Sequence, residues 1–203
     1  RLVLTKCIKQ IKKGVFMTDG KLANPAPLGL LGFGMTTILL NFHNAGFYPL
    51  DTMIMAMGIF YGGIAQVIAG VLEFKKGNTF GFVAFTSYGF FWMTLVFILV
   101  SPWAQTRPSG LAMPMYFLIW GLFTLFMFYG TLNGNRATQV VFGSLVILFV
   151  LLALRDITHS GAIGKLAGWE GLFCGFSAVY TAAAEILNEK YERTVLPLGD
   201  KKA

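Results

Sequence analysis

The sequence predicts an all-α fold: a polytopic membrane protein with six transmembrane helices and both termini cytoplasmic. Hydrophobic residues make up 56% of the 203 residues and charged residues only 12%, about half the charged fraction of a soluble domain. Six segments are long and uncharged enough to cross a hydrocarbon core about 30 Å thick, which takes about 20 helical residues. Basic residues also gather on one side of the resulting topology. Composition, span length and charge distribution therefore all indicate a membrane protein with six helices.

The chain begins with a basic amphipathic stretch, RLVLTKCIKQIKKGVF, at residues 1–16. It is too charged for the apolar core of a signal peptide, and a stretch of this kind can lie on an anionic membrane surface. Because the first residue is Arg1 and Met17 opens the next segment, residues 1–16 have two interpretations: a native part of the chain, or an upstream, non-native extension. We expect a basic cytoplasmic N-terminal segment at 1–20, a six-helix transmembrane domain at 21–190 and a cytoplasmic C-terminal tail at 191–203.

The first expected transmembrane helix, at residues 25–42, has a sharp start and a polar face. In NPAPLGLLGFGMTTILLNFHN, Asn24 suits the N-cap and Pro25 the first helical position. A small residue, an aromatic ring, a hydroxyl and an amide then recur at every fourth position: Gly29, Phe33, Thr37 and Asn41. This face is too polar for lipid, so we expect it to contact other helices or a water-filled path. Plain helix packing through glycine is the alternative interpretation.

The remaining helices are expected at residues 53–72, 80–100, 111–132, 137–154 and 166–186, joined by short connections that contain turn-forming or charged residues. No Lys or Arg lies within these segments. The carboxylates Glu73, Glu170 and Glu185 are expected near helix ends, where partial hydration makes a charge tolerable. Glycine pairs at GxxxG spacing indicate close packing around the second and sixth helices: Gly58 with Gly62, Gly164 with Gly168, and Gly171 with Gly175.

The sixth expected helix also carries a polar stripe, in which Ser177, Thr181 and Glu185 follow at intervals of four residues. Hydroxyls and amides can replace part of a small anion's water shell without trapping the ion. We therefore expect the first and sixth helices to line one path. Hydrogen bonding between packed helices is the alternative.

The basic residues predict the orientation of the helices. If both termini share one side of the membrane, that side holds 13 of the 16 Lys and Arg residues, and the other side holds Arg107, Arg155 and Lys165. Leaving out the five basic residues within 1–16 still gives eight against three. Because cytoplasmic segments carry an excess of Lys and Arg, both termini are expected in the cytoplasm.

The sequence offers little for catalysis or metal binding. Cys7 and Cys174 give neither a disulfide framework nor a metal cluster, and His43 and His159 have no Cys or carboxylate cluster beside them. His159 next to Ser160 is not a catalytic pair, because adjacent side chains rarely face each other. We expect no enzyme activity, no cofactor and no metal, and the net charge of +7 needs no nucleic acid to explain it.

Eight motifs follow one another along nearly the whole chain: NPAPLGLLGFGMTTILLN, HNAGF, YGGIAQVIAG, EFKKGNTFG, FTSYG, FTLFMFYGTLNG, AGWEG and NEKYERTVLP. From about Lys21 to Gly199 the chain closely resembles the acetate uptake transporter family, the succinate/acetate transporters of bacteria, archaea and fungi. A lone NPxP would be unspecific, whereas NPAPLGL with its companions in order is highly specific.

The resemblance implies a multi-pass protein of the cell (plasma or inner) membrane, with six helices per subunit and a ring-shaped hexamer. It also implies that acetate and related short-chain carboxylates, succinate among them, pass through each subunit. It implies an apolar constriction of Phe33 in LGFGM, Tyr88 in TSYG and Leu145 in GSLV. Ala178 matches a pore-lining position where a small side chain leaves room for substrate. Together with the polar stripes, the expected pore-lining or substrate-binding residues are Asn24, Thr36, Thr37, Asn41, Ser177, Ala178 and Thr181.

Two transport mechanisms stay open. A small carboxylic acid with a pKa of about 4.3 is almost fully ionised at pH 7, and protonating it there costs about 3.7 kcal/mol. Carrying the anion past an apolar constriction costs at least about 2.5 to 3.5 kcal/mol. An anion channel and a proton-coupled symporter are therefore both expected alternatives. Since no Asp, Glu or His lies mid-span, any proton should move on the substrate or through water. A channel for small neutral solutes and a non-transporting membrane scaffold are the other functions considered.

Overall fold

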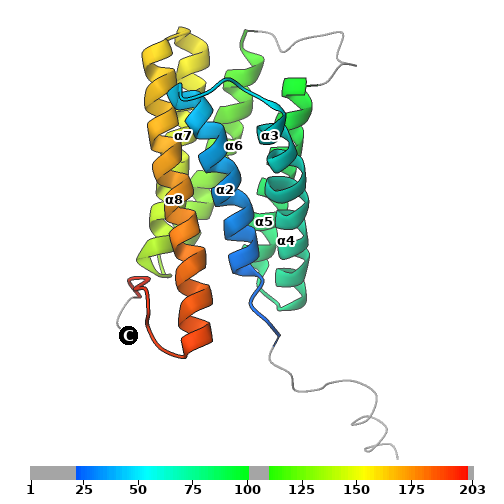
Figure 1. Cartoon of the computed structure of the whole chain (residues 1–203), viewed down its shortest axis with the longest axis vertical. Coiled ribbons are helices and arrows are strands. Elements are labelled where there is room, and N and C mark those ends of the chain that lie inside the picture. Colours follow the sequence, from blue (N-terminus) through cyan, green and yellow to red (C-terminus); the bar gives the residue numbers. More distant parts are fainter. Residues whose placement is uncertain (1–21, 101–109, 201–203) are drawn as a thin grey trace, which may run out of the picture.

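The computed structural model describes residues 22–100 and 110–200, which form a bundle of long helices (Figure 1). No β-strand occurs in this described part of the chain. The elements are α2 (Ala26–Ala45), α3 (Thr52–Ala56), the π-helix η1 (Met57–Ala65), α4 (Gln66–Lys75), α5 (Thr79–Val100), α6 (Ala112–Thr131), α7 (Arg136–Thr158) and α8 (Gly161–Tyr191). Because α3, η1 and α4 follow one another without a break, they form one membrane-length helix.

The all-helical fold is confirmed, and all the expected helices are present. Five of them are long and apolar enough to cross a membrane, with α3, η1 and α4 counted as a single span of 24 residues. The sixth, α8, is the longest helix with 31 residues, but Lys165, Glu170 and Glu185 lie along it. The outer faces of the bundle are apolar, most clearly on α6, where Ile119, Leu122 and other large side chains are exposed. Such faces are typical of helices that contact lipid or neighbouring subunits.

Most helix ends differ from the sequence prediction by one to five residues, and three of these differences affect the site. The first helix begins at Ala26 with Pro25 at the N-cap, one residue later than expected, and the Asn24 side chain still accepts a hydrogen bond from the Ala26 N–H at 3.3 Å. Helix α7 continues to Thr158, so Arg155 and Asp156 belong to the helix rather than to a loop. Helix α8 begins five residues before its expected start, because the Ser160 side chain caps the Ile163 N–H.

The π-helix η1 in the second span was not predicted from the sequence. Its wide turns contain Gly58, Gly62 and Gly63, whose bare backbones fit closely against neighbouring helices. A Cβ atom added to Gly62 would lie 2.9 Å from the Trp92 ring and 3.0 Å from Thr36, and one added to Gly58 would lie 2.5 Å from Val96. The expected close packing of the Gly58–Gly62 pair is therefore confirmed, and it extends to a third glycine.

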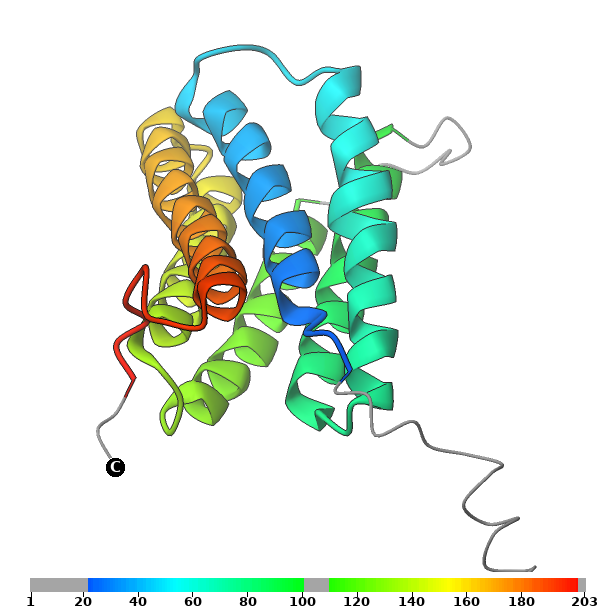
Figure 2. The same cartoon turned by 60° about the horizontal axis from the view of Figure 1, so that its bottom comes forward.

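Helix α2 lies between α8 on one side and the continuous helix of α3, η1 and α4 on the other (Figures 1 and 2). Glycines bring α2 and α8 into backbone contact. A Cβ atom added to Gly34 would lie 2.8 Å from the Gly175 carbonyl oxygen, and one added to Gly171 would overlap the Asn41 side chain. A third face of α2, between its contacts with α8 and with the second span, is directed at α5 and α7.

The start of α2 and the end of α8 lie at the same end of the bundle (Figure 1). Beyond Tyr191 the chain folds back along α8 and reaches the start of α7. The Tyr180 hydroxyl donates to the Pro197 carbonyl at 2.7 Å, and the Arg136 N–H donates to the Gly199 carbonyl at 3.0 Å. The tail thereby accepts hydrogen bonds from N–H groups that the first turn of α7 cannot pair internally.

Several sequence expectations fall outside the described residues. These are the basic segment at 1–20 with Cys7, the connection that contains Pro102, Arg107 and Pro108, and the last residues at 201–203.

Candidate functional site

Two cavities enter the bundle from opposite ends. The near cavity, at the end where α2 begins and α8 ends, has a volume of about 190 Å³ and is lined by the first halves of α2, α5 and α7 together with Gln66 and Glu185. The far cavity has a volume of about 120 Å³ and is lined by the second halves of α2, α5 and α7 and the start of α6. At about 30 Å³ per water molecule in the liquid, each has room for several water molecules or a small solute. Both cavities lie between α2, α5 and α7, and α8 reaches the near one through Glu185.

Phe33 and Leu145 line both cavities and so separate them. Tyr88 lines the near cavity, and its ring centroid lies 6.0 Å from that of Phe33. All three side chains are at least 95% buried. The structure thus brings together the three residues predicted to form the constriction, on three different helices. Between the two cavities the surface these side chains present is apolar.

Tyr88 is held by its hydroxyl as well as by its ring. The Tyr88 and Thr124 hydroxyl oxygens are 2.9 Å apart, and Thr124 donates to the Trp120 carbonyl at 2.7 Å. Because the single Thr124 proton is used in that bond, Tyr88 donates to Thr124. The ring also contacts the rings of Phe123 and Phe142. These contacts fix the ring at the boundary between the cavities and direct its polar end toward α6.

The far cavity contains the polar face predicted for α2. Thr37 donates to the Phe33 carbonyl at 2.7 Å, and Asn41 donates to the Thr37 carbonyl at 2.9 Å. Asn44 in turn donates to the Asn41 side-chain oxygen at 2.9 Å. These bonds lie along α2 itself, so each side chain is fixed without a partner from another helix. The cavity therefore has an ordered polar wall on α2 and mostly apolar walls elsewhere.

Arg155 and His43 add cationic and titratable groups to the far cavity. The Arg155 Nε donates to the Asp156 carboxylate at 2.7 Å, and its guanidinium lies 5.9 Å from the centre of the Phe117 ring. The Nδ1 of His43 lies 3.0 Å from the Tyr48 carbonyl, which can only accept, so Nδ1 carries the proton. In the loop that follows α2, desolvation and then the neighbouring Asp51 raise the pKa of Tyr48 above its ordinary value.

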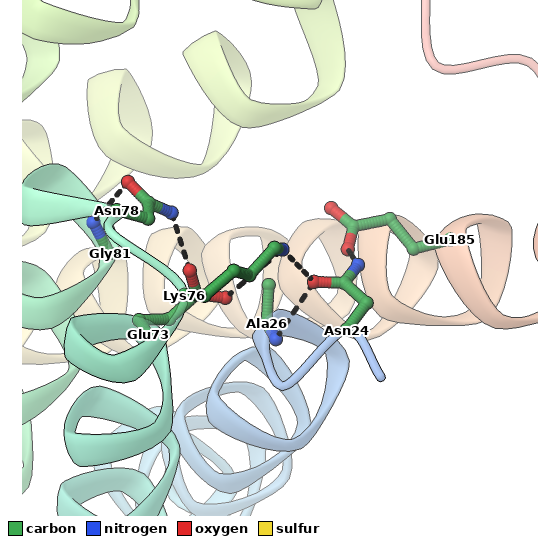
Figure 3. A network of polar contacts seen from close by, with 7 residues as sticks. All are labelled: Asn24, Ala26, Glu73, Lys76, Asn78, Gly81 and Glu185. Carbon is green, nitrogen blue, oxygen red and sulfur yellow. Dashed lines mark hydrogen bonds and ion pairs between the residues drawn. The ribbon is translucent and has the colours of Figure 1, made fainter. Parts of the chain in front are cut away.

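A polar network closes the rim of the near cavity (Figure 3). The Asn24 amide donates to Glu185 at 2.8 Å and accepts from the Lys76 ammonium at 2.8 Å, which links the starts and ends of three helices. Lys76 also lies 3.7 Å from a Glu73 carboxylate oxygen, and Asn78 donates to the other oxygen at 2.6 Å. The network thus joins two carboxylates, one ammonium and two amides.

Glu73 corrects the expectation that the carboxylates near helix ends are partly hydrated. Its side chain is fully buried, whereas Glu170 and Glu185 are partly exposed as expected. The turn between α4 and α5 folds Asn78 and Lys76 over Glu73, so that one carboxylate oxygen accepts from Asn78, while the other has the Lys76 ammonium 3.7 Å away and no hydrogen-bond partner. A buried charge is tolerable when it is paired and hydrogen-bonded in this way.

The remaining predicted pore residues do not line either cavity. Thr36 faces the second span and lies 3.4 Å from the Met57 carbonyl. Ser177 and Thr181 donate to carbonyls of their own helix at 2.7 and 2.8 Å. Ala178 is fully buried at the contact with Gly34. The joint polar path expected between the first and last helices is absent from these two cavities, because the glycine contacts bring α2 and α8 too close together; α8 contributes Glu185 instead.

The prediction also missed residues that the cavities do contain. Gln66, Asn78 and Thr138 line the near cavity, and His43, Asn44 and Arg155 line the far cavity. Gln66 had a detectable signal, since an amide in the middle of an apolar span needs a polar surrounding. Arg155 had no such signal, because the sequence prediction assigned it to a loop outside the helices. Within the described residues, no group of three or more His, Cys, Asp or Glu side chains could hold a metal ion.

Comparison with known proteins gives consistent matches over most of the chain. The family model described as the GPR1/FUN34/yaaH family matches residues 10–199. The "Succinate-acetate/proton symporter SatP" of Escherichia coli (strain K12) is 60% identical over 186 residues, which is 91% of this chain and 99% of that protein. "Acetate permease A" of Emericella nidulans is 34% identical over 198 residues, 88% of this chain and 66% of that protein. A solved structure titled "Structure of the bacterial acetate channel SatP" is 61% identical, with a TM-score of 0.86 over 88% of this chain and all of that one.

Proposed function

Because this chain belongs to the GPR1/FUN34/yaaH family, as its motifs predicted, we propose that it is a membrane transporter, not an enzyme, for acetate and related short-chain carboxylates, with succinate among them. The observation that carries the proposal is the pair of cavities that approach each other from opposite ends of the bundle and share Phe33 and Leu145. The names of the relatives, a symporter, a permease and a channel for such acids, agree with it.

The path runs from one cavity to the other past Phe33, Tyr88 and Leu145. A carboxylate entering the far cavity meets the Arg155 guanidinium and the polar wall of α2, both of which favour an anion. At the constriction the substrate loses these contacts and crosses an apolar boundary. It then enters the near cavity, where Gln66 and Thr138 offer neutral polar groups and Glu185 stands at the rim.

Two forms of the substrate can cross this boundary at comparable cost. Protonating the acid at pH 7 costs about 3.7 kcal/mol, and moving the anion through an apolar region costs at least about 2.5 to 3.5 kcal/mol. The names of the relatives divide in the same way, since one is called a proton symporter and another a channel. The proposal therefore covers both an anion channel and a proton-coupled symporter.

The orientation and assembly follow from charge and exposed surface. Beyond residue 16, eight basic residues fall on the side of the membrane that holds the termini and three on the other side. This excess supports a cytoplasmic location for both termini. The cytoplasmic segments are then residues 1–20 and 191–203, and the transport domain between them is residues 21–190. The near cavity then opens to the cytoplasm and the far cavity to the outside. The exposed apolar face of α6 supports a homo-oligomer, a hexamer by family resemblance, in the cell membrane.

The test is uptake of labelled acetate into liposomes that contain the purified protein, with the membrane potential and the pH gradient imposed separately. Protein-free liposomes give the background, and unlabelled glycerol tests for a neutral-solute channel. Flux that follows the potential alone means an anion channel, and flux that follows the pH gradient and ignores the potential means proton-coupled transport. Flux no greater than background under either gradient, or flux that glycerol suppresses, contradicts the proposal.

A further inference from the structure

Gln66 is a buried amide in the near cavity that the polar network at the rim does not use. It is the first residue of α4, directly after the π-helix η1, and its side chain is 1% exposed. Its Oε1 atom has no hydrogen-bond partner, and no hydrogen bond joins the Gln66 amide to any of the described residues. Since buried polar groups in proteins are almost always paired, an unpaired amide in a cavity indicates a partner that comes from outside the chain.

Other polar side chains in the same cavity already have partners within the protein. Asn78 binds Glu73 and the Gly81 N–H, Glu185 binds Asn24, and the Tyr88 hydroxyl binds Thr124. Gln66 differs from them because its donor and its acceptor are both free. It also shares the cavity wall with Phe33, Tyr88 and Leu145, the residues of the constriction.

The backbone explains how an amide comes to occupy this position. The wide turns of η1 place Gly62 and Gly63 against the neighbouring helices, and the Gln66 N–H is bonded to the Gly63 carbonyl where the π-helix ends. Gly32 of α2 lies beside Gln66, since a Cβ atom added there would be 3.8 Å from the Gln66 Cβ. The absence of a side chain on Gly32 lets the Gln66 side chain pass α2. π-helical turns inside α-helices are frequent at functional sites.

We infer that Gln66 binds the carboxyl group of the substrate in the near cavity and determines which form of the acid is bound best. This inference rests on the proposed function. A primary amide and a neutral carboxylic acid can form two hydrogen bonds at once, from the amide N–H to the acid carbonyl and from the acid O–H to the amide oxygen. A carboxylate can form only the first, and its second oxygen faces the amide oxygen without a proton between them. Gln66 therefore favours the neutral acid.

The charged and titratable groups around Gln66 are few. Tyr88 of α5 and Glu185 of α8 line the same cavity, while the α2 and α7 residues that line it are not titratable. On the continuous helix that carries Gln66, the neighbouring titratable residues are Tyr61 before it and Glu73 after it, and Glu73 is paired with Asn78 and Lys76. Because Tyr88 and Glu185 already have hydrogen-bond partners, Gln66 is a neutral group next to the constriction whose paired donor and acceptor can distinguish the acid from its anion.

The experiment compares the acetate concentration for half-maximal flux in wild-type protein and in Gln66→Met, at pH 5.5 and pH 8, in liposomes with equal pH on both sides. Met keeps similar length and volume but removes the donor and the acceptor. We expect the half-saturating concentration to rise about tenfold at pH 5.5, the factor that corresponds to about 1.4 kcal/mol, and by less at pH 8. The smaller effect at pH 8 follows because the second hydrogen bond exists only with the neutral acid.

Gln139 provides a matched control within the same chain. It is also a buried glutamine, but its amide lies within 3.4 Å of three carbonyls of the α6–α7 turn, and it lines neither cavity. Gln139→Met should lower the thermal unfolding temperature and leave the half-saturating concentration within about twofold of wild type at both pH values. An equal rise in both variants would mean that loss of a buried amide acts through stability, and would overturn the inference.

Each remaining outcome separates the inference from the proposed function. If wild-type protein transports acetate and Gln66→Met has the same half-saturating concentration, the amide binds water rather than substrate and the inference is wrong, while the proposed function stands. If the wild-type protein gives no flux above background, the proposed function itself fails. If Gln66→Met does not fold, Gln66→Asn decides: its shorter amide should raise the half-saturating concentration, and an unchanged value overturns the inference.

Discussion

Truncating Phe33 and Leu145 together is the most direct test of the proposed constriction. These side chains line both cavities, so the double variant Phe33→Ala/Leu145→Ala should connect the near and far cavities through space that water can fill. The Tyr88 ring remains, held by Thr124 and its aromatic neighbours. We expect acetate flux driven by the membrane potential to rise, because the anion then keeps part of its water shell through the whole bundle.

The energy of crossing an apolar region sets the size of the effect. An ion at the centre of a membrane span costs at least about 2.5 to 3.5 kcal/mol. Since about 1.36 kcal/mol corresponds to tenfold in rate, removal of the whole penalty would raise anion flux roughly 70-fold to 400-fold. The remaining Tyr88 ring keeps part of the barrier, so a rise of at least tenfold is expected, with a smaller rise for each single variant.

The assay is potential-driven uptake of labelled acetate without a pH gradient, together with chloride flux as a measure of lost selectivity. Truncation of a buried Phe or Leu costs about 2 to 5 kcal/mol of stability in a packed core, so the thermal unfolding temperature must be measured in parallel. Leu172→Ala is the matched control, because Leu172 is 5% exposed on α8 and lines neither cavity. Wild-type acetate and chloride flux in a folded double variant would refute the constriction.

Three further variants test the packing, the rim network and the role of a hydroxyl. Gly171→Ala should destabilise the fold by about 1 to 3 kcal/mol in thermal unfolding, because the new methyl group overlaps Asn41, whereas Gly161→Ala, with no atom within 4 Å, should show no loss. Asn24→Leu should lower acetate flux about threefold to tenfold, because it frees the Glu185 carboxylate at the rim; undiminished flux would contradict this. Tyr88→Phe should leave the number of protons per acetate unchanged while costing about 0.5 to 1.5 kcal/mol of stability, and a changed ratio in a coupled-flux measurement would implicate the hydroxyl in proton transfer.

The sequence was sufficient for the features that depend on local pattern. Runs of apolar residues predicted the helices to within a few residues, and the four-residue recurrence of Phe33, Thr37 and Asn41 placed them on one face of α2, where the structure has them beside the far cavity. The family resemblance supplied Tyr88 and Leu145. These signals are local in the chain, or are carried by motifs, and neither kind requires knowledge of which helices meet.

The features that were missed depend mostly on contacts that the spacing of residues within one helix does not show. The polar stripe of α8 suggested a path beside α2, but the glycines of both helices let their backbones touch, and the cavities lie beside this contact, between α2, α5 and α7. The π-helix η1, which contains Gly62, was also missed, and so was the place of Gln66 directly after it in the wall of the near cavity. Glu73 is buried because Asn78 and Lys76 fold back over it. The spacing of residues along a helix predicts which face each side chain lies on, whereas the side chain's contact partner depends on how the helices assemble.

The arrangement of titratable groups limits how protons can accompany the substrate. Among the described residues that line the cavities, His43 and Arg155 belong to the far side and Glu185 to the near side, and only Phe33 and Leu145 are shared. Tyr88 at the boundary already donates to Thr124, whose own proton is bonded to the Trp120 carbonyl, so a relay through Tyr88 would first have to break both bonds. A proton that crosses the constriction must therefore travel on the carboxyl group or along water. A neutral amide at Gln66 favours the first of these routes, because it holds the protonated acid by two hydrogen bonds at the point where the substrate meets the apolar boundary.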